Sequence, residues 1–161
     1  NHRVTKWTPD TAEGEVIAGG NGEGNAANQL AFPLGIAVSR DGSLYVADTY
    51  NHRIQKWNPG AKKGITILSA DDLKDDLRRH YFSGISLVDN NLLLVTDYEQ
   101  KRILQYDLTT KAVQIVAASS SLDNENEKLS QPYQVVLDPL GSIIIADAKN
   151  NRIQKWIPES K

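Results

Sequence analysis

Hydrophobic residues occur along the chain in short runs that are separated by polar turns. The stretch Leu44–Trp57 (LYVADTYNHRIQKW) has the pattern of a strand, a tight turn and a second strand. The pattern recurs at Leu93–Tyr106 and Ile143–Trp156, and its second half also occurs at Asn1–Trp7. A fixed period of about 50 residues indicates a repeat architecture. One arginine in each copy marks this period, with spacings of 50, 49 and 50 residues: Arg3, Arg53, Arg102 and Arg152.

Each period contains four short strands in up-and-down order. The second strand of each complete copy is continuously apolar, which predicts that neighbouring sheets bury both of its faces. The third strands are more polar, as expected nearer an outer edge. The four units are expected to contribute two, four, four and three strands. The thirteen expected strands are Asn1–Trp7, Val16–Ala18, Gly35–Val38, Leu44–Asp48, Arg53–Trp57, Ile65–Leu68, Gly84–Leu87, Leu92–Thr96, Arg102–Tyr106, Val113–Ala117, Val135–Leu137, Ile143–Ala146 and Arg152–Trp156.

Polar connectors separate the units. The first, Gly19–Asn28, is glycine-rich, but a phosphate-binding glycine loop is followed by a helix, and here a strand follows. We therefore interpret it as an inter-unit connector. In the second connector, Ser69–Phe82, Leu73 and Leu77 have helical spacing, which favours a short helical turn over a solvated charged loop. The third connector is Ser119–Gln131.

An aspartate ends each second strand, and an arginine opens each third strand five residues later. A hairpin places these residues side by side, so the carboxylate could cap turn amides and bind the guanidinium at two points. Catalytic carboxylates are the rival interpretation, but a pair repeated in every unit is typical of a scaffold. The aromatic residue that follows, Trp7 in the first copy, is interpreted as inter-sheet packing rather than a ligand cage. The structural motif residues are Asp48, Arg53, Trp57, Asp97, Arg102, Tyr106, Asp147, Arg152 and Trp156.

Two glycines open the first strands of the complete units. Gly35 and Gly84 are expected to permit close backbone approach where strands crowd together. Gln134 holds this position in the third unit and breaks the rule.

Three segments resemble the NHL repeat, which is named for Asn-His-Leu and here reads Asn51-His52-Arg53. The segments are FPLGIAV, LYVADTYNHRIQKW and QPYQVVL with IIIADAKNNRIQKW. The resemblance covers nearly the whole chain, strongly in the first and third units and weakly in the second. It implies an all-β fold: a partial, open β-propeller of four-stranded antiparallel blades, in a family whose propellers usually have six blades. The WD dipeptide is absent, and only Gly19-Gly20 shows the double glycine typical of kelch repeats.

The domain expected from this pattern is a single propeller fragment over residues 1–161. Its divisions are a partial blade at 1–32, blades at 33–81 and 82–131, and a partial blade at 132–161. Because residue 1 lies inside a motif and the chain has no methionine, we expect an internal piece of a longer protein. Two complete and two partial blades do not close into a ring. The expected partners therefore include the remaining blades of the parent chain or a second copy.

Composition excludes several classes of function. The net charge of −2 gives no global field that would favour nucleic acid or an anionic membrane. The chain has no cysteine, so disulfides and thiolate metal sites are excluded, although this fits any compartment. No apolar run approaches the ~20 residues of a membrane span, so membrane insertion is not expected. Neither a signal-peptide pattern nor a glycosylation sequon is present, and the localisation is left open.

The resemblance implies a binding platform, because most NHL proteins bind proteins and some bind RNA. A minority are enzymes, such as an amidating lyase whose propeller holds zinc with histidines. This chain has three histidines, His2, His52 and His80. The first two occupy the motif position itself and His80 lies in an unrelated connector, so they do not form the convergent three-ligand set of a zinc site. Neither metal nor cofactor is expected.

By up-and-down topology, the connectors and the turns after the second strands should share one face. The partner-binding residues expected on this face are Tyr50, His52, Tyr98, Lys101 and Lys149. Acidic connector residues on the same face disfavour RNA because they spoil a phosphate footprint. These acidic residues are Asp71, Asp72, Asp75, Asp76, Asp123, Glu125 and Glu127.

The sequence therefore predicts a non-catalytic interaction module that binds a protein or another macromolecular partner through its loop face. The alternatives are the propeller domain of a hydrolase or lyase whose catalytic residues lie outside this fragment, and an RNA-binding NHL domain.

Overall fold

The computed structural model describes residues 1–73, 75, 79–119 and 128–157. Its strands lie within two residues of the predicted ones, apart from the first strand of the third unit, which starts three residues earlier than predicted. Their bounds are β1 Arg3–Lys6, β2 Glu15–Gly19, β3 Pro33–Val38, β4 Leu44–Asp48, β5 Arg53–Trp57, β6 Ile65–Ser69, β7 Phe82–Leu87, β8 Leu92–Asp97, β9 Arg102–Asp107, β10 Val113–Ala118, β11 Pro132–Leu137, β12 Ile143–Asp147 and β13 Arg152–Trp156.

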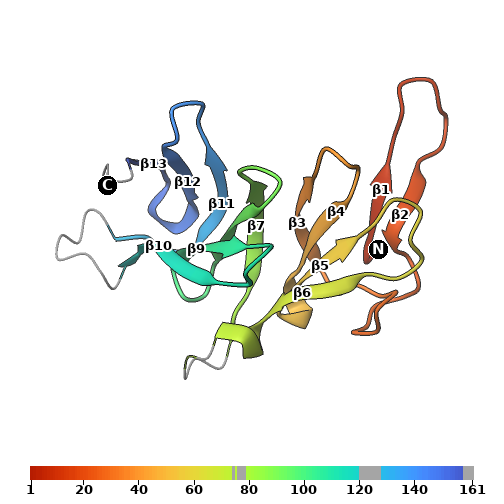
Figure 1. The fold of residues 1–161 in the computed structure, drawn as a ribbon, viewed down its shortest axis with the longest axis horizontal. Helices are drawn as coiled ribbons and strands as arrows, with labels where there is room; N and C mark the ends of the chain where they lie inside the picture. Colours follow the sequence, from red (N-terminus) through yellow and green to blue (C-terminus); the bar gives the residue numbers. More distant parts are fainter. Residues whose placement is uncertain (74, 76–78, 120–127, 158–161) are drawn as a thin grey trace.

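These strands form four antiparallel sheets in which each strand pairs with its neighbour in the chain. The sheets contain β1-β2, β3-β4-β5-β6, β7-β8-β9-β10 and β11-β12-β13. Figure 1 shows them following one another along the molecule without closing into a ring. The fold is thus an open β-propeller of antiparallel blades whose complete members are four-stranded, as the sequence predicted.

Helical structure is confined to short 3-10 turns within the described ranges. The predicted helical turn of the second connector is a 3-10 turn at Ala70–Leu73, whereas Leu77 lies outside the described residues. No helix in the part of the chain that the structure describes is long and apolar enough to cross a membrane.

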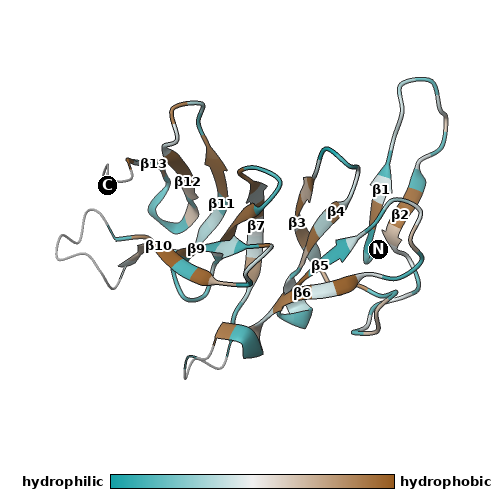
Figure 2. Ribbon diagram, viewed as in Figure 1, coloured by the Kyte–Doolittle hydropathy of each residue, from teal (hydrophilic) through white to brown (hydrophobic). Residues whose placement is uncertain are grey.

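The core consists of three clusters of buried side chains, one between each pair of successive sheets. Leu44 and Val46 of β4 face the first sheet, whereas Tyr45 and Ala47 face β7 and β8 on the other side. Every residue of β4 is buried, as predicted for both faces, whereas β12 alternates buried and half-buried residues. Figure 2 shows the hydrophobic colouring concentrated on the strands and the hydrophilic colouring on the loops.

In three of the four units, the aromatic residue four positions after the motif arginine packs toward the preceding sheet. Trp57 and Tyr106 are buried, and Trp156 is half-buried against the cluster between the second and third complete units. Trp7 occupies the same repeat position but is 64% exposed. It belongs to the first sheet, which has no preceding sheet in the described chain, so this residue does not pack between sheets.

The two first-strand glycines allow successive blades to touch through their backbones. A Cβ atom on Gly35 would lie 2.3 Å from the Ser83 carbonyl oxygen, and one on Gly84 would lie 2.6 Å from the Tyr133 carbonyl oxygen. Both distances are far below van der Waals contact, and both obstacles are backbone atoms that cannot rotate away. The close approach predicted from the sequence is therefore present at both positions.

The face of β3 that points away from β7 lacks the cover that its counterparts have. Ile36, Ile85 and Val135 hold one repeat position, yet Ile36 is 50% exposed whereas Ile85 is 1% and Val135 0% exposed. The first sheet contributes only β1 and β2, so no inner strand lies over Ile36 in the described chain. An apolar sheet face of this kind is a surface for association.

We predict that Gly35→Ala lowers the free energy of unfolding by about 1–3 kcal/mol or more, because the new methyl group meets the β7 backbone. Chemical denaturation measures the change. Val38→Ala, an exposed position on the same strand, is the control and should cost much less. Equal effects of the two substitutions would show that the close approach is unimportant for stability.

We predict that the isolated chain self-associates through its uncovered sheet faces, and that Ile36→Lys reduces the association because it places a charge on one of them. Light scattering over a range of concentrations measures both effects. A stable monomer of 17.8 kDa with a sharp thermal transition would contradict this prediction.

Candidate functional site

The turns after the second strands and the inter-unit connectors meet on one face, as predicted. In each of the two complete units and in the three-stranded third unit, one turn amide donates to a connector carbonyl oxygen. The three bonds are Tyr50 N to Ala31 O at 3.1 Å, Tyr98 N to Tyr81 O at 3.0 Å and Lys149 N to Ser130 O at 3.1 Å. We call this surface the loop face.

A tight turn brings each aspartate beside its arginine. In the first complete unit, Thr49–Asn51 form a 3-10 turn and His52 adopts the left-handed conformation with φ of 53°. The residues at the same position in the other copies, His2, Lys101 and Asn151, also have positive φ. The chain can therefore reverse within four residues, which places Asp48 opposite Arg53 at the start of the β4–β5 ladder.

Asp48 links the turn, the connector and β5. Its Oδ1 accepts the amide of Ala31 at 2.6 Å, and its Oδ2 accepts Nε of Arg53 at 2.7 Å and Nδ2 of Asn51 at 2.8 Å. The other guanidinium nitrogens of Arg53 donate to the connector carbonyls of Asn25, Ala26 and Gln29. The Asp–Arg pairing was predicted, but its expected geometry was wrong in two respects. The guanidinium is not held at two points, and the capped amide lies in the connector rather than in the turn.

The third unit repeats this arrangement. Asp147 Oδ1 accepts the amide of Ser130 at 2.6 Å, and its Oδ2 accepts Nδ2 of Asn150 at 2.8 Å and Nε of Arg152 at 2.9 Å. Arg152 also donates to the carbonyl of Lys128. Two units therefore use the same backbone contacts to hold their connectors.

The second unit uses ionisable side chains in place of these contacts. Asp97 Oδ2 accepts Nε of Arg102 at 2.9 Å and lies 2.8 Å from Nδ1 of His80. Asp75 Oδ2 accepts an Arg102 nitrogen at 2.7 Å, and its Oδ1 lies 3.0 Å from Nε2 of His80. Asp97 Oδ1 has no hydrogen-bond partner among the described residues. Burial raises the pKa of Asp97 above its ordinary value, while His80 and Arg102 oppose that shift.

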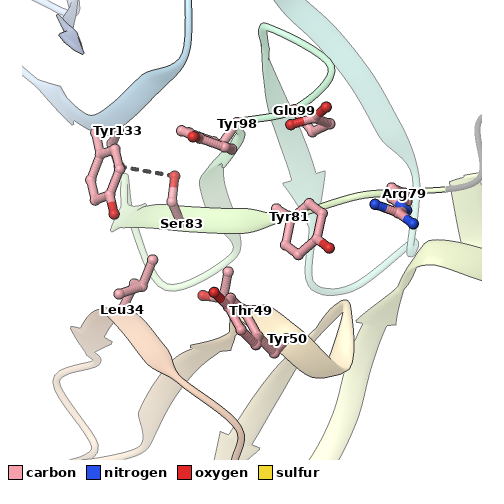
Figure 3. Close-up of a pocket in the computed structure, with 9 residues that line it drawn as sticks. All are labelled: Leu34, Thr49, Tyr50, Arg79, Tyr81, Ser83, Tyr98, Glu99 and Tyr133. Atoms are coloured by element: carbon pink, nitrogen blue, oxygen red, sulfur yellow. Dashed lines mark hydrogen bonds between the residues drawn. The ribbon is translucent and has the colours of Figure 1, made fainter. Parts of the chain in front are cut away.

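A pocket of about 320 Å³ opens on the loop face where the three complete or nearly complete units meet (Figure 3). Figure 3 shows side chains from different blades surrounding it, with Leu34 and Tyr50 on one side and Tyr98 and Tyr133 on the other. The hydroxyl of Ser83 donates to the carbonyl of Tyr133 across the pocket floor. The lining residues are Leu34, Thr49, Tyr50, Arg79, Tyr81, Ser83, Tyr98, Glu99 and Tyr133.

Aromatic rings continue from this pocket along the loop face. Phe32 stacks on Tyr50 with ring centroids 4.4 Å apart, and His2 contacts Phe32 edge-on at 5.0 Å. Tyr81 contacts Tyr50 at 6.0 Å. Phe32 and Tyr50 are about half exposed, so they remain accessible to a partner.

The structure separates the five residues expected to bind a partner. Tyr50 and Tyr98 line the pocket, whereas His52 lies behind it, with its ring against Tyr81 at 4.8 Å and its Nδ1 2.9 Å from the His80 carbonyl oxygen. Lys101 and Lys149 are exposed and do not line the pocket.

Sequence reasoning missed Tyr81, Tyr133 and His80. Repeat register offers a signal for two of them. Tyr133 aligns with the lining residues Leu34 and Ser83, and His80 lies 17 residues before Asp97, as Ala31 does before Asp48. His80 is therefore not in an unrelated loop, because its position is the one that caps the motif aspartate in the other units.

The loop face carries charges of both signs. Of the acidic residues expected there, Asp71, Asp72 and Asp75 are described, and Asp75 is bound to Arg102. Asp76, Asp123, Glu125 and Glu127 lie outside the described residues. Within the described ranges, no group of three or more His, Cys, Asp or Glu side chains is placed to hold a metal ion.

Comparison with known proteins identifies the repeat. A family model described as "NHL repeat" matches residues 30–57 and 129–156. Human NHL repeat-containing protein 2 is 29% identical over 130 residues, which cover 74% of this chain and 18% of that protein. The chain spans less than a fifth of the length of the curated relatives it matches.

Solved structures share the fold at low sequence identity. Virginiamycin B lyase from Staphylococcus aureus has a TM-score of 0.62 and 19% identity, over 85% of this chain and 42% of that one. A chain of a nidogen/laminin complex has a TM-score of 0.63 and 16% identity, over 97% of this chain and 57% of that one. At these identities the likeness shows the fold alone.

We predict that Arg53→Ala lowers the free energy of unfolding by ~3 kcal/mol or more, because it leaves the fully buried Asp48 carboxylate without its cation. Thermal and chemical denaturation measure the loss. Arg40→Ala, at an exposed position of the same unit, is the control and should be nearly neutral. An unchanged melting temperature for Arg53→Ala would rule out a stabilising role for this pair.

Proposed function

We propose that the chain, which matches the NHL-repeat model at residues 30–57 and 129–156, is a non-catalytic interaction module that binds a protein partner through its loop face. The observation that carries this proposal is the tyrosine-walled pocket where three units meet. We also propose the domain division given by the repeats: a partial blade at 1–32, blades at 33–81 and 82–131, and a partial blade at 132–161.

The size of the pocket favours an anchoring side chain or a short segment of a protein. Its volume of about 320 Å³ lies at the low end of the ~300–1,000 Å³ typical of small-molecule sites. Protein partners commonly insert one aromatic or basic residue into such a depression and surround it with weaker contacts. The half-exposed rings of Phe32 and Tyr50 would extend the contact beyond the pocket.

The lining chemistry suits protein recognition. Tyrosine is enriched at protein interfaces because its ring buries a large apolar area while its hydroxyl stays hydrogen-bonded. Arg79 and Glu99 place one positive and one negative charge at the same pocket, so both signs of side chain on a partner find a counterpart. This mixture does not favour the uniform negative charge of a nucleic-acid backbone.

The motif residues have a different role in this proposal. Asp48, Asp147 and their arginines hold the connectors in place, and the aromatic residues Trp57, Tyr106 and Trp156 pack between sheets. They act as scaffold for the loop face rather than as contacts to the partner. Solved neighbours include a lyase and a chain from a nidogen/laminin complex, so the likeness of fold by itself does not choose between catalysis and binding.

We predict that Tyr50→Ala and Tyr98→Ala each weaken partner binding by roughly 30-fold, which corresponds to a hot-spot loss of about 2 kcal/mol. Peptides selected from a random phage-displayed library on the purified chain serve as the probe. Isothermal titration calorimetry measures their affinity, and circular dichroism checks that both variants fold.

Leu140→Ala is the matched control, because Leu140 is 87% exposed in a turn on the opposite face. It should leave the affinity unchanged. The proposal would be contradicted if the selected peptides bound at the turns around Asp41 or Asn90. It would also be contradicted if the protein bound single-stranded RNA and no peptide.

A further inference from the structure

The connector of the second unit is held by four ionisable side chains rather than by backbone groups. His80 is 1% exposed and lies between Asp97, which is fully buried, and Asp75, whose side chain is 26% exposed. Arg102 bridges the same two carboxylates from the other side. We call these four residues the histidine cluster. His52 also lies near, and its Nδ1 meets the backbone oxygen of His80 rather than its ring.

The geometry of the cluster favours an extra proton, although a guanidinium nitrogen of Arg102 also lies 3.4 Å from Nδ1 of His80. Both ring nitrogens of His80 face carboxylate oxygens, at 2.8 and 3.0 Å. An ionised carboxylate only accepts hydrogen bonds, so each of these contacts needs a proton between nitrogen and oxygen. A neutral imidazole carries one N–H and therefore satisfies one contact. The second proton resides on the ring, which becomes imidazolium, or on the Asp97 carboxyl.

Charge balance supports the same conclusion. With imidazolium, the cluster contains two cations and two carboxylates and is neutral. Without the extra proton these four side chains sum to one net negative charge at a site where His80, Asp97 and Arg102 are buried, and net charge in a buried site is costly.

The other two units have no such dependence on a proton. Asn51 supplies to Asp48 Oδ2 the hydrogen bond that His80 supplies to Asp97, and Asn150 does so for Asp147. An amide side chain does not titrate in the physiological range. The second unit has Gln100 at the asparagine position, and its side chain donates instead to the backbone of Arg79.

The cluster lies directly next to the tyrosine pocket. His80 is followed by Tyr81 and preceded by Arg79, and both neighbours line the pocket. The amide of Tyr98, a third lining residue, donates to the carbonyl of Tyr81. Release of His80 would therefore free two pocket residues and remove the hydrogen bond that holds a third.

We propose that the histidine cluster is a proton-dependent lock that holds the 79–81 segment against the second unit and thereby keeps the tyrosine pocket formed. Its consequence for partner binding rests on the proposed function, whereas the lock itself does not. The lock is closed when the cluster holds its extra proton, and it weakens as the pH rises and that proton is lost.

The direction of the pH dependence follows from the proton count. The closed form holds an extra proton between a His80 ring nitrogen and a carboxylate oxygen, and an opened segment no longer needs it. Opening therefore becomes easier as the pH rises, by up to about tenfold per pH unit for one proton. Asp97 acts in the same direction: its pKa is raised by burial, so its contribution is present at low pH and is lost as the pH rises through the folded value.

Native-state hydrogen exchange of three amides in the unaltered protein tests the lock. The Tyr98 amide reports on the second unit, and the analogous turn-to-connector amides of Tyr50 and Lys149 report on the units without a histidine. After correction for intrinsic exchange, the protection of Tyr98 should fall by more than tenfold between pH 6 and pH 8.5. The protection of Tyr50 and Lys149 should change little. Equal changes at all three amides, or constant protection at Tyr98, would overturn the proposal.

Two substitutions separate the lock from a merely structural role. His80→Asn replaces the ring donor with an amide and should reduce the pH dependence of Tyr98 protection to the part that Asp97 contributes. Asn51→Ala should lower the protection of Tyr50 by the same factor at every pH, because the amide bonds that it removes do not titrate. An unchanged pH dependence in His80→Asn would overturn the assignment to His80.

The lock and the proposed function fail in different ways. Exchange at Tyr98 is measured without any partner. If Tyr98 protection falls with pH as predicted but no peptide binds, the proposed function is refuted and the lock is still supported. Peptide affinity that falls from pH 6 to pH 8.5 in the unaltered protein, but not in His80→Asn, would support both.

Discussion

One buried aspartate in each unit holds together the parts of the chain that form the loop face. It lies at the end of the second strand, where the sheet stops and the turn begins. From there, Asp48 reaches the turn through Asn51, the third strand through Arg53 and the connector through the amide of Ala31. Because a buried carboxylate is costly unless its hydrogen bonds are satisfied, these contacts are coupled, and removal of one leaves charge exposed to an apolar environment.

This constraint explains why a face made of loops can present a defined pocket. The connectors place Leu30 and Leu129 in the core clusters, and their backbone groups are fixed to a rigid sheet through the aspartate and the arginine. The innermost strands bring the blades into backbone contact at Gly35 and Gly84, so pocket residues from three units come together. The spacing of the pocket walls therefore depends on close packing at the strands, and the orientation of the walls depends on the buried ion pairs.

The sequence predicted the strands, their order and the Asp–Arg pairing, because these features recur with a period and each copy supports the others. It did not predict that Arg53 would spread its guanidinium over connector carbonyls, since connectors vary in length and sequence and offer no period. Of the residues that line the pocket, the sequence analysis named only Tyr50 and Tyr98 as contacts to a partner. Tyr133 was missed because it belongs to a strand, and its exposure depends on which side of that strand faces the loop face.

The second unit departs most from the repeat, and this departure carries the most information. A family model matches the first and third units and leaves the second unmatched. Gln100 stands where the other two units have asparagine, and His80 and Asp75 supply donors and acceptors that those units take from an amide and the backbone. The substitution preserves the shape of the loop face while it exchanges neutral groups for charged ones. A fold that tolerates this exchange at one blade can acquire sensitivity to protons there without altering the stability of its neighbours, since each blade contacts only the next.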